Sequence, residues 1–300
     1  MTTTPVVAVG VDGSESALAA LDWAVEYARS HAASLRLVTG LEIPTPGFVP
    51  YPLPDLHEAA EKDARQLLDA ALAHVHAAAP ELDVAGSVAG QPPVPALLEA
   101  SRRSALLVVG CRGLTPFADL LLGSVSAAVT AHAPGPVVVV RGGGAARTDA
   151  PVVVGVHGGE HEDATLEAAF EEADRRGASL LAVHAWSDVT LESAAGTVVG
   201  LWPTWDRLRA EAGHRLTAAL EPWRARYPAV QVGTLVVCDR PAAALVERAA
   251  TAQLLVVGSH GRGGFAGMRL GSVARRLVHH ADCPVLVVRT PAGQEPHARL

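Results

Sequence analysis

GCRGLTPFADLLLGS, at residues 110–124, is matched 148 positions later by GSHGRGGFAGMRLGS, at residues 258–272. The two stretches differ in the middle but share one spacing: glycine, two residues, glycine, nine residues, glycine, serine. Each follows an apolar run, ALLVVG or QLLVVG, and each leads into a segment whose apolar residues recur at helical spacing. The spacing therefore predicts a loop that joins the end of a strand to the start of a helix, and this loop occurs twice in the chain.

The repetition extends over nearly the whole chain. VGVDG at 9–13 matches VGVHG at 154–158 with an offset of 145, whereas PVVVVR matches PVLVVR with an offset of 148. RGGGAARTDA, between the copies, is rich in glycine and alanine and has no apolar periodicity, which is typical of a linker. The predicted parts are a first nucleotide-binding domain over 1–141, a linker over 142–150, a second such domain over 151–290 and a tail over 291–300.

Within each copy, valine-rich runs alternate with segments of helical periodicity. VVAVGV is followed by a predicted helix with Ser14 as its N-cap, in which small and apolar residues recur from Ala17 to Ala28. Strands that are apolar throughout are buried on both faces, and their alternation with helices indicates a mostly parallel sheet. The sequence predicts the α/β class, with two tandem open parallel-sheet domains of five strands each.

The glycine loop is suited to binding phosphate. A helix start offers unpaired backbone N–H groups and the positive end of the helix dipole, both of which stabilise an anion. Glycine allows the backbone to approach closely, and a serine hydroxyl adds a hydrogen-bond donor. Asp12 follows the first strand, which usually flanks the ligand crevice of such sheets, so its carboxylate can accept hydrogen bonds from ribose hydroxyls or an adenine amino group. Asp12 also fits a simple turn before the Ser14 cap.

Composition argues against several other classes of protein. The chain has 24 basic and 31 acidic residues, a net charge of −7, which does not favour nucleic-acid binding. Three cysteines without a CxxC pair predict neither a disulfide framework nor a zinc site. We see no signal peptide and no run approaching the ~18 apolar residues that span a membrane, so we expect a cytoplasmic protein. The single lysine, Lys62, excludes a Walker loop.

The GxxGx9GS spacing, VGVDGS at 9–14 and the HAxxPVVVVR ending together resemble the universal stress protein family in its tandem two-domain form. The resemblance covers roughly 5–141 and 151–289. It implies a Rossmann-like, adenine nucleotide alpha-hydrolase-like fold with strand order 3-2-1-4-5 and membership of an ATP-binding subclass. It also implies that the last strands of the two domains pair antiparallel, so that the halves form a pseudo-dimer.

The resemblance also implies which residues bind the nucleotide. In the first domain they are Gly10, Asp12 and Val38 for adenine and ribose, and Gly110, Cys111, Arg112, Gly113, Gly123, Ser124 and Val125 for phosphate. In the second domain they are Gly155, His157 and Val183, and then Gly258, Gly261, Arg262, Gly271, Ser272 and Val273.

Each domain departs from the family pattern in a different place. His157 stands where the resemblance implies an aspartate, which puts the ribose contact of the second domain in doubt. In the first domain, Thr115-Pro116 replaces Gly263-Gly264 and Asp119 replaces Gly267, which stiffens the phosphate loop and adds negative charge to it. Occupancy of neither, one or both sites stays open at this stage.

We expect a regulatory protein of the stress response that binds ATP, with or without Mg²⁺, and whose occupancy changes domain pairing or partner binding. Expected partners are a second copy, through the last strand of each domain, and a protein that the sequence does not identify. The alternatives are a slow ATPase that uses the same cradle, and a scaffold that binds no nucleotide. Phosphoryl transfer needs a cationic clamp, a carboxylate that holds metal and a positioned nucleophile. Asp12, Arg112 and Arg262 are the only candidates near the loops, so the sequence favours binding and predicts no catalytic residue.

Overall fold

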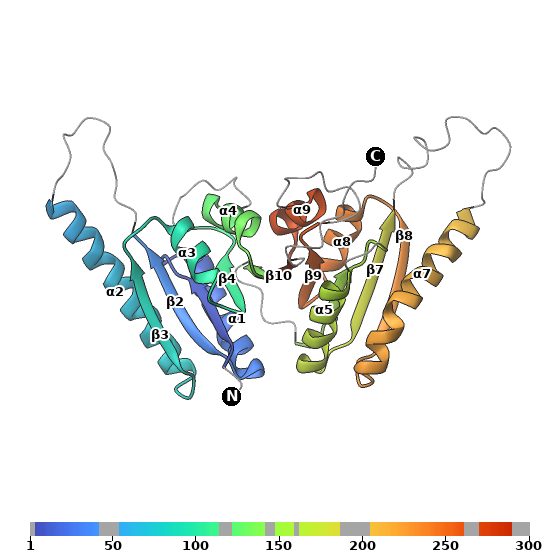
Figure 1. Cartoon of the computed structure of the whole chain (residues 1–300), viewed down its shortest axis with the longest axis horizontal. Helices are drawn as coiled ribbons and strands as arrows, with labels where there is room; N and C mark the ends of the chain where they lie inside the picture. Colours follow the sequence, from blue (N-terminus) through green and yellow to red (C-terminus); the bar gives the residue numbers. More distant parts are fainter. Residues whose placement is uncertain are drawn as a thin grey trace. The chain divides into compact units, whose positions relative to one another are not determined.

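The computed structural model describes residues 4–41, 54–113, 122–141, 148–158, 162–186, 205–260 and 270–289. The chain divides into two compact units, Met1–Gly143 and Gly144–Leu300, which we call unit 1 and unit 2 (Figure 1).

Unit 1 alternates strands and helices around a parallel sheet. Its elements are β1 (Val6–Gly10), α1 (Glu15–His31), β2 (Ser34–Gly40), α2 (Pro54–Ala78), β3 (Val84–Ala89), α3 (Pro93–Ser101), β4 (Leu106–Gly110), α4 (Ser124–His132) and β5 (Val137–Val140). The strand order is β3-β2-β1-β4-β5, with every neighbouring pair parallel. In register, Val7 of β1 lies opposite Leu35 of β2 on one side and Leu106 of β4 on the other.

Unit 2 repeats this arrangement. Its elements are β6 (Val152–Gly155), α5 (Asp163–Arg176), β7 (Leu180–Trp186), α7 (Trp205–Arg226), β8 (Val232–Cys238), α8 (Pro241–Ala249), β9 (Leu254–Gly258), α9 (Ser272–His280) and β10 (Val285–Val288). The strand order is β8-β7-β6-β9-β10, again with parallel pairs. The order predicted for each domain is therefore confirmed. Antiparallel pairing of β5 with β10 concerns the placement of the two units and stays a prediction.

The core of each unit is the sheet together with the helix faces that pack on it. All five residues of β4 and all four of β5 are buried, as the continuous apolar runs predict. Right-handed crossovers place α1 and α2 on one face of the sheet and α3 and α4 on the other, and each of these pairs is in contact. Within the part of the chain that the structure describes, no helix is long and apolar enough to cross a membrane.

The winding direction reverses between β1 and β4 in unit 1, and between β6 and β9 in unit 2. In open parallel sheets, ligands bind beyond the carboxyl ends of the strands at this switch point. Asp12 and His157 follow β1 and β6, and the glycine loops follow β4 and β9. The topology therefore brings the two halves of each predicted site to the same end of one sheet.

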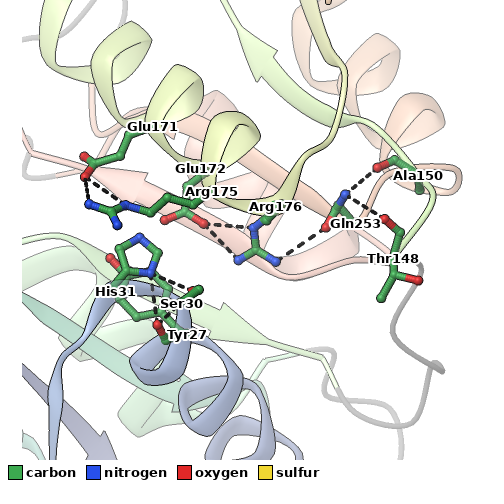
Figure 2. A network of polar contacts seen from close by, with 10 residues as sticks. All are labelled: Tyr27, Ser30, His31, Thr148, Ala150, Glu171, Glu172, Arg175, Arg176 and Gln253. Atoms are coloured by element: carbon green, nitrogen blue, oxygen red, sulfur yellow. Dashed lines mark hydrogen bonds and ion pairs between the residues drawn. The ribbon is translucent and has the colours of Figure 1, made fainter. Parts of the chain in front are cut away.

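A polar network fixes the start of unit 2 (Figure 2). Arg176 donates through Nε to Glu172 Oε2 at 2.9 Å, and its Nη1 lies 3.5 Å from Gln253 Oε1. Gln253 Nε2 in turn donates to the backbone oxygens of Ala150, at 2.5 Å, and Thr148, at 3.3 Å. The chain just before β6 is thereby attached to α5 and to the residues that precede β9.

Candidate functional site

The switch point of unit 1 brings Asp12 against the glycine loop. β1 and β4 are neighbours, so Asp12, two residues after β1, lies beside Gly113, three residues after β4. A Cβ added at Gly113 would lie only 2.8 Å from Asp12 Oδ2. The predicted sugar-binding carboxylate and the predicted phosphate loop are therefore adjacent, although they are far apart in the sequence.

The two oxygens of Asp12 have different environments. Oδ1 accepts hydrogen bonds from Ser14 N at 3.0 Å and from Ser14 Oγ at 2.6 Å. Asp12 therefore stabilises the turn before α1, as its position in the sequence also allowed. Ser14 Oγ accepts from Ala17 N at 3.1 Å, which confirms Ser14 as the N-cap of α1. Oδ2 faces Gly113 and accepts no hydrogen bond from the residues that the structure describes. The half-buried carboxylate thus keeps one oxygen for a ligand.

Ser16 ties the end of β4 to the first turn of α1. Its Oγ accepts a hydrogen bond from Arg112 N at 3.1 Å and lies 3.6 Å from Cys111 Sγ. A Cβ added at Gly110 would lie 2.5 Å from Ser16 O, so only glycine allows this approach. Sequence reasoning missed Ser16, because a serine in a first helical turn is common and no local pattern shows that a distant strand ends against it.

The start of α4 forms the phosphate end of the site. Gly123 is the N-cap, with φ −71° and ψ 154°, and no side chain caps the first turn. Gly123 N donates to Cys111 O at 2.7 Å, and Ser126 Oγ donates to Gly110 O at 2.6 Å, which fixes the helix start against the end of β4. Ser124 is exposed and Val125 half-buried, so the first turn can meet an anion.

Three predicted residues have structural roles of their own. The Cys111 side chain is buried, at 3% exposure, and contacts Ser16, so only its backbone is available to a ligand. A Cβ added at Gly10 would lie 3.1 Å from Leu97 Cδ2, so Gly10 packs closely against α3. The Val38 side chain is buried and its carbonyl accepts a hydrogen bond from Val11 N at 3.1 Å.

Unit 2 keeps the phosphate end of the site. Gly271 is the N-cap of α9, with φ −65° and ψ 157° and no side-chain cap, and its N donates to Ser259 O at 2.7 Å. Ser272 is exposed and Val273 half-buried, like their counterparts in unit 1. Gly155 approaches Leu245, Val183 is buried, and Gly258 ends β9. Gly261, Arg262, Thr115-Pro116, Asp119, Gly263-Gly264 and Gly267 lie outside the described residues.

The sugar end of unit 2 is built differently. At the offset of 145, Glu162 takes the place of Ala17, and α5 begins only at Asp163, with 14 residues against 17 in α1. The Glu162 carboxylate turns back to the end of β6, where Oε1 accepts hydrogen bonds from His157 N and, at 2.8 Å, from Gly158 N. The same oxygen lies 3.2 Å from His157 Nδ1. Glu162 is only 7% exposed.

A second substitution changes the neighbouring strand. Thr39 of β2 donates to Val11 O at 3.0 Å, and at the corresponding place in β7 His184 Nδ1 bonds Val156 O at 2.8 Å. The buried imidazole lies under Gly158, whose added Cβ would be 3.4 Å from His184 Cε1. Sequence reasoning missed both Glu162 and His184. The signal was available, since the offset of 145 pairs an acid with the first buried alanine of a helix.

Comparison with known proteins agrees with the repeat. The profile of the universal stress protein family matches residues 5–141 and again 150–289. A universal stress protein of Mycobacterium bovis is 39% identical over 308 residues, covering 97% of this chain and 96% of the relative. One from Mycobacterium tuberculosis is 38% identical over 290 residues, covering 94% and 96%.

A solved structure extends the comparison to the fold. The crystal structure of a universal stress protein from Archaeoglobus fulgidus matches with a TM-score of 0.71 at 19% identity, covering 96% of this chain and 99% of that one. At that identity the likeness shows a shared fold. The double profile match and the relatives that span almost the full length show more: the chain belongs to the universal stress protein family, with two family domains in tandem.

Proposed function

We propose that this protein is a regulatory ATP-binding protein of the stress response, with ATP held at the switch point of unit 1. The observation that carries the proposal is the contact between Asp12 Oδ2 and Gly113 at the end of the sheet where α4 begins. A hydrogen-bond acceptor for a sugar and a helix start for phosphates lie next to each other there. A nucleotide requires this combination of groups.

The residues of unit 1 suit each part of the ligand. Asp12 Oδ2 would accept hydrogen bonds from the ribose hydroxyls, while Gly113 and Gly123 leave the backbone open to the phosphates. The Ser124 hydroxyl and the dipole of α4 would add hydrogen bonding and positive potential, and the exposed Arg112 would add charge. Mg²⁺, where present, would be held mainly by the phosphate oxygens, as is common at nucleotide sites.

Binding at this place can change the sheet edge. The ligand would contact the first turn of α4, and β5 follows α4 directly in the chain. The loop, the start of α4 and the end of β4 are joined through the hydrogen bonds of Gly123 and Ser126. Occupancy would therefore order α4 and the edge strand β5, the strand through which the pseudo-dimer is proposed to form.

The same site is poorly equipped for catalysis. Among the described residues near Gly113, Asp12 is the acid and Arg112 the cation, and Asp12 is committed to the sugar end. Phosphoryl transfer ordinarily uses more charged groups than these. We expect hydrolysis well below about 1 s⁻¹, the low end of typical enzymes.

Gly123→Asp tests the binding proposal. An added Cβ there meets only ordinary contacts, 3.5 Å to Arg112 Cα and to Gly113 N, and aspartate is a favoured N-cap, so the fold should be kept. The new carboxylate would compete with phosphate for the helix start, and we expect ATP affinity at unit 1 to fall at least ~100-fold. Gly123→Asn is the matched control, because asparagine has nearly the same shape as aspartate without the charge. We expect the ATP affinity of this variant to fall less than ~10-fold.

The measurements are nucleotide released from the purified protein on denaturation, and calorimetric titration with ATP and Mg²⁺. Equal losses in the Asp and Asn variants would show that charge at the helix start is irrelevant. Absence of both released nucleotide and titration heat in the unaltered protein would leave a scaffold. Steady turnover above about 1 s⁻¹ would establish an ATPase instead.

A further inference from the structure

We infer that the Glu162 carboxylate occupies the sugar end of the cradle in unit 2, so that the chain binds one nucleotide, in unit 1. The inference rests on the proposed function and goes beyond it, because it assigns the number of ATP molecules bound per chain and names the side chain that prevents binding in unit 2.

The starts of α4 and α9 are alike, so the first turns of these two helices do not explain a difference in binding. Gly123 and Gly271 are both uncapped N-caps with the same backbone conformation, and each donates to the first residue after the preceding strand at 2.7 Å. A clear difference between the two units among the described residues lies at the sugar end, where Glu162 takes the place of Ala17.

The Glu162 carboxylate takes hydrogen-bond donors that a ligand would otherwise meet. Its Oε1 is bound by the backbone N–H groups of His157 and Gly158, the first residues beyond the end of β6 that face the crevice. In unit 1 the corresponding residue is Ala17, whose methyl group is buried and reaches neither group. The crevice of unit 2 thus holds an acceptor supplied by the protein.

This carboxylate does not serve as a helix cap. Glu162 stands at the N-cap of α5, yet its side chain makes no cap hydrogen bond to that helix. It points back to the strand end, where His157 Nδ1 lies 3.2 Å from Oε1. An almost fully buried carboxylate is costly unless it is well bonded, so these contacts hold Glu162 in place.

The remaining changes also oppose a nucleotide. Glu162 Oε1 is already bonded to the backbone N–H groups of His157 and Gly158, whereas Asp12 Oδ2 accepts no hydrogen bond from the described residues. His157 is a poor replacement for Asp12 Oδ2, because its Nδ1 lies 3.2 Å from Glu162 Oε1 and a neutral imidazole has a single acceptor nitrogen. His184 lies under Gly158, whereas Leu67 lies under the corresponding Gly13 in unit 1.

The first experiment counts nucleotides and assigns them to a unit. We expect one ATP per chain by calorimetry for the unaltered protein, none for Gly123→Asp, and still one for Gly271→Asp. Two per chain, or one that survives Gly123→Asp and is lost in Gly271→Asp, would overturn the inference. No binding by the unaltered protein would instead show that the proposed function fails.

The second experiment opens unit 2. The double variant Glu162→Ala/His157→Asp places the residues of unit 1 at the sugar end, and we expect the stoichiometry to rise from one to two. Glu162→Gln is the matched control, since its amide oxygen still accepts hydrogen bonds from the same N–H groups. We expect this variant to bind one ATP per chain. Asp12→His, made in the chain whose unit 2 is unaltered, should reduce the number of bound ATP molecules from one to none. If the double variant is folded by circular dichroism and still binds one ATP per chain, Glu162 is not what prevents nucleotide binding in unit 2.

Discussion

Gly110→Ala is expected to destabilise unit 1 by about 3 kcal/mol and to weaken ATP binding at the proposed site, whereas Gly258→Ala should cost less than about 1 kcal/mol. The two glycines stand at the same place in the repeat, at the ends of β4 and β9. A Cβ at Gly110 would lie 2.5 Å from Ser16 O and 2.6 Å from Ser16 C, which are backbone atoms of α1. Relief requires α1 to move away from β4 and breaks the bond between Ser16 Oγ and Arg112 N.

At Gly258 the same methyl group meets looser surroundings. The nearest atoms would be Thr165 Oγ1 at 3.1 Å and His260 O at 3.3 Å, so a shift of a few tenths of an ångström suffices. Hydrogen exchange measured separately on peptides from α1 and α5 would give the local stability of each unit. Equal protection from hydrogen exchange in the two variants would show that the close contact with Ser16 does not make Gly110 less tolerant of substitution than Gly258.

Arg176→Ala is expected to destabilise unit 2 by about 3–5 kcal/mol, because it leaves a buried carboxylate without its cation. The side chain of Glu172 is 4% exposed and lies 2.8 Å from Arg176 Nη2. The same substitution removes the contact to Gln253, which bonds the chain before β6. Urea unfolding followed by tryptophan fluorescence in a Trp23→Phe background reports on unit 2, because the remaining tryptophans lie in that unit and Trp223 stacks on the buried Phe170.

Arg175→Ala is the matched control on the same helix. Arg175 and Glu171 form a pair with the same i,i+4 spacing, but their side chains are 39% and 43% exposed. Solvent screens such a pair, and we expect a loss within about 0.5 kcal/mol. The double variant Glu172→Leu/Arg176→Met should recover most of the loss by removing the buried charge together with its partner. Equal effects of Arg175→Ala and Arg176→Ala would show that burial does not set the energy of these pairs.

The differences between the units bear on how the protein would work. Two intact sites would respond to ATP together, whereas one site would make a single unit the sensor. In unit 1 Asp12 Oδ2 accepts no hydrogen bond from the described residues, and in unit 2 Glu162 is bonded at the matching end. Under the proposed function, ATP would therefore act on unit 1 alone.

Much of the architecture was predictable from the sequence, because it depends on local patterns. Continuous apolar runs and helical periodicity predicted alternating buried strands and helices, and Ser14 was recognised as an N-cap. The doubled glycine spacing located the ends of β4 and β9 and the starts of α4 and α9. The strand order followed from the family resemblance, and it placed Asp12 beside Gly113.

Only the tertiary structure showed how the two sites differ. Ser16, in the first turn of α1, accepts a hydrogen bond from Arg112 just after β4, and Glu162 turns from its helix back to the end of β6. Neither contact follows from periodicity, because periodicity describes which face of an element is buried and not which group fills the crevice at its end. The sequence could show that His157 replaces an aspartate. It could not show that the Glu162 carboxylate lies beside His157. That contact depends on where α5 begins and on the direction of the Glu162 side chain, which only the folded chain determines.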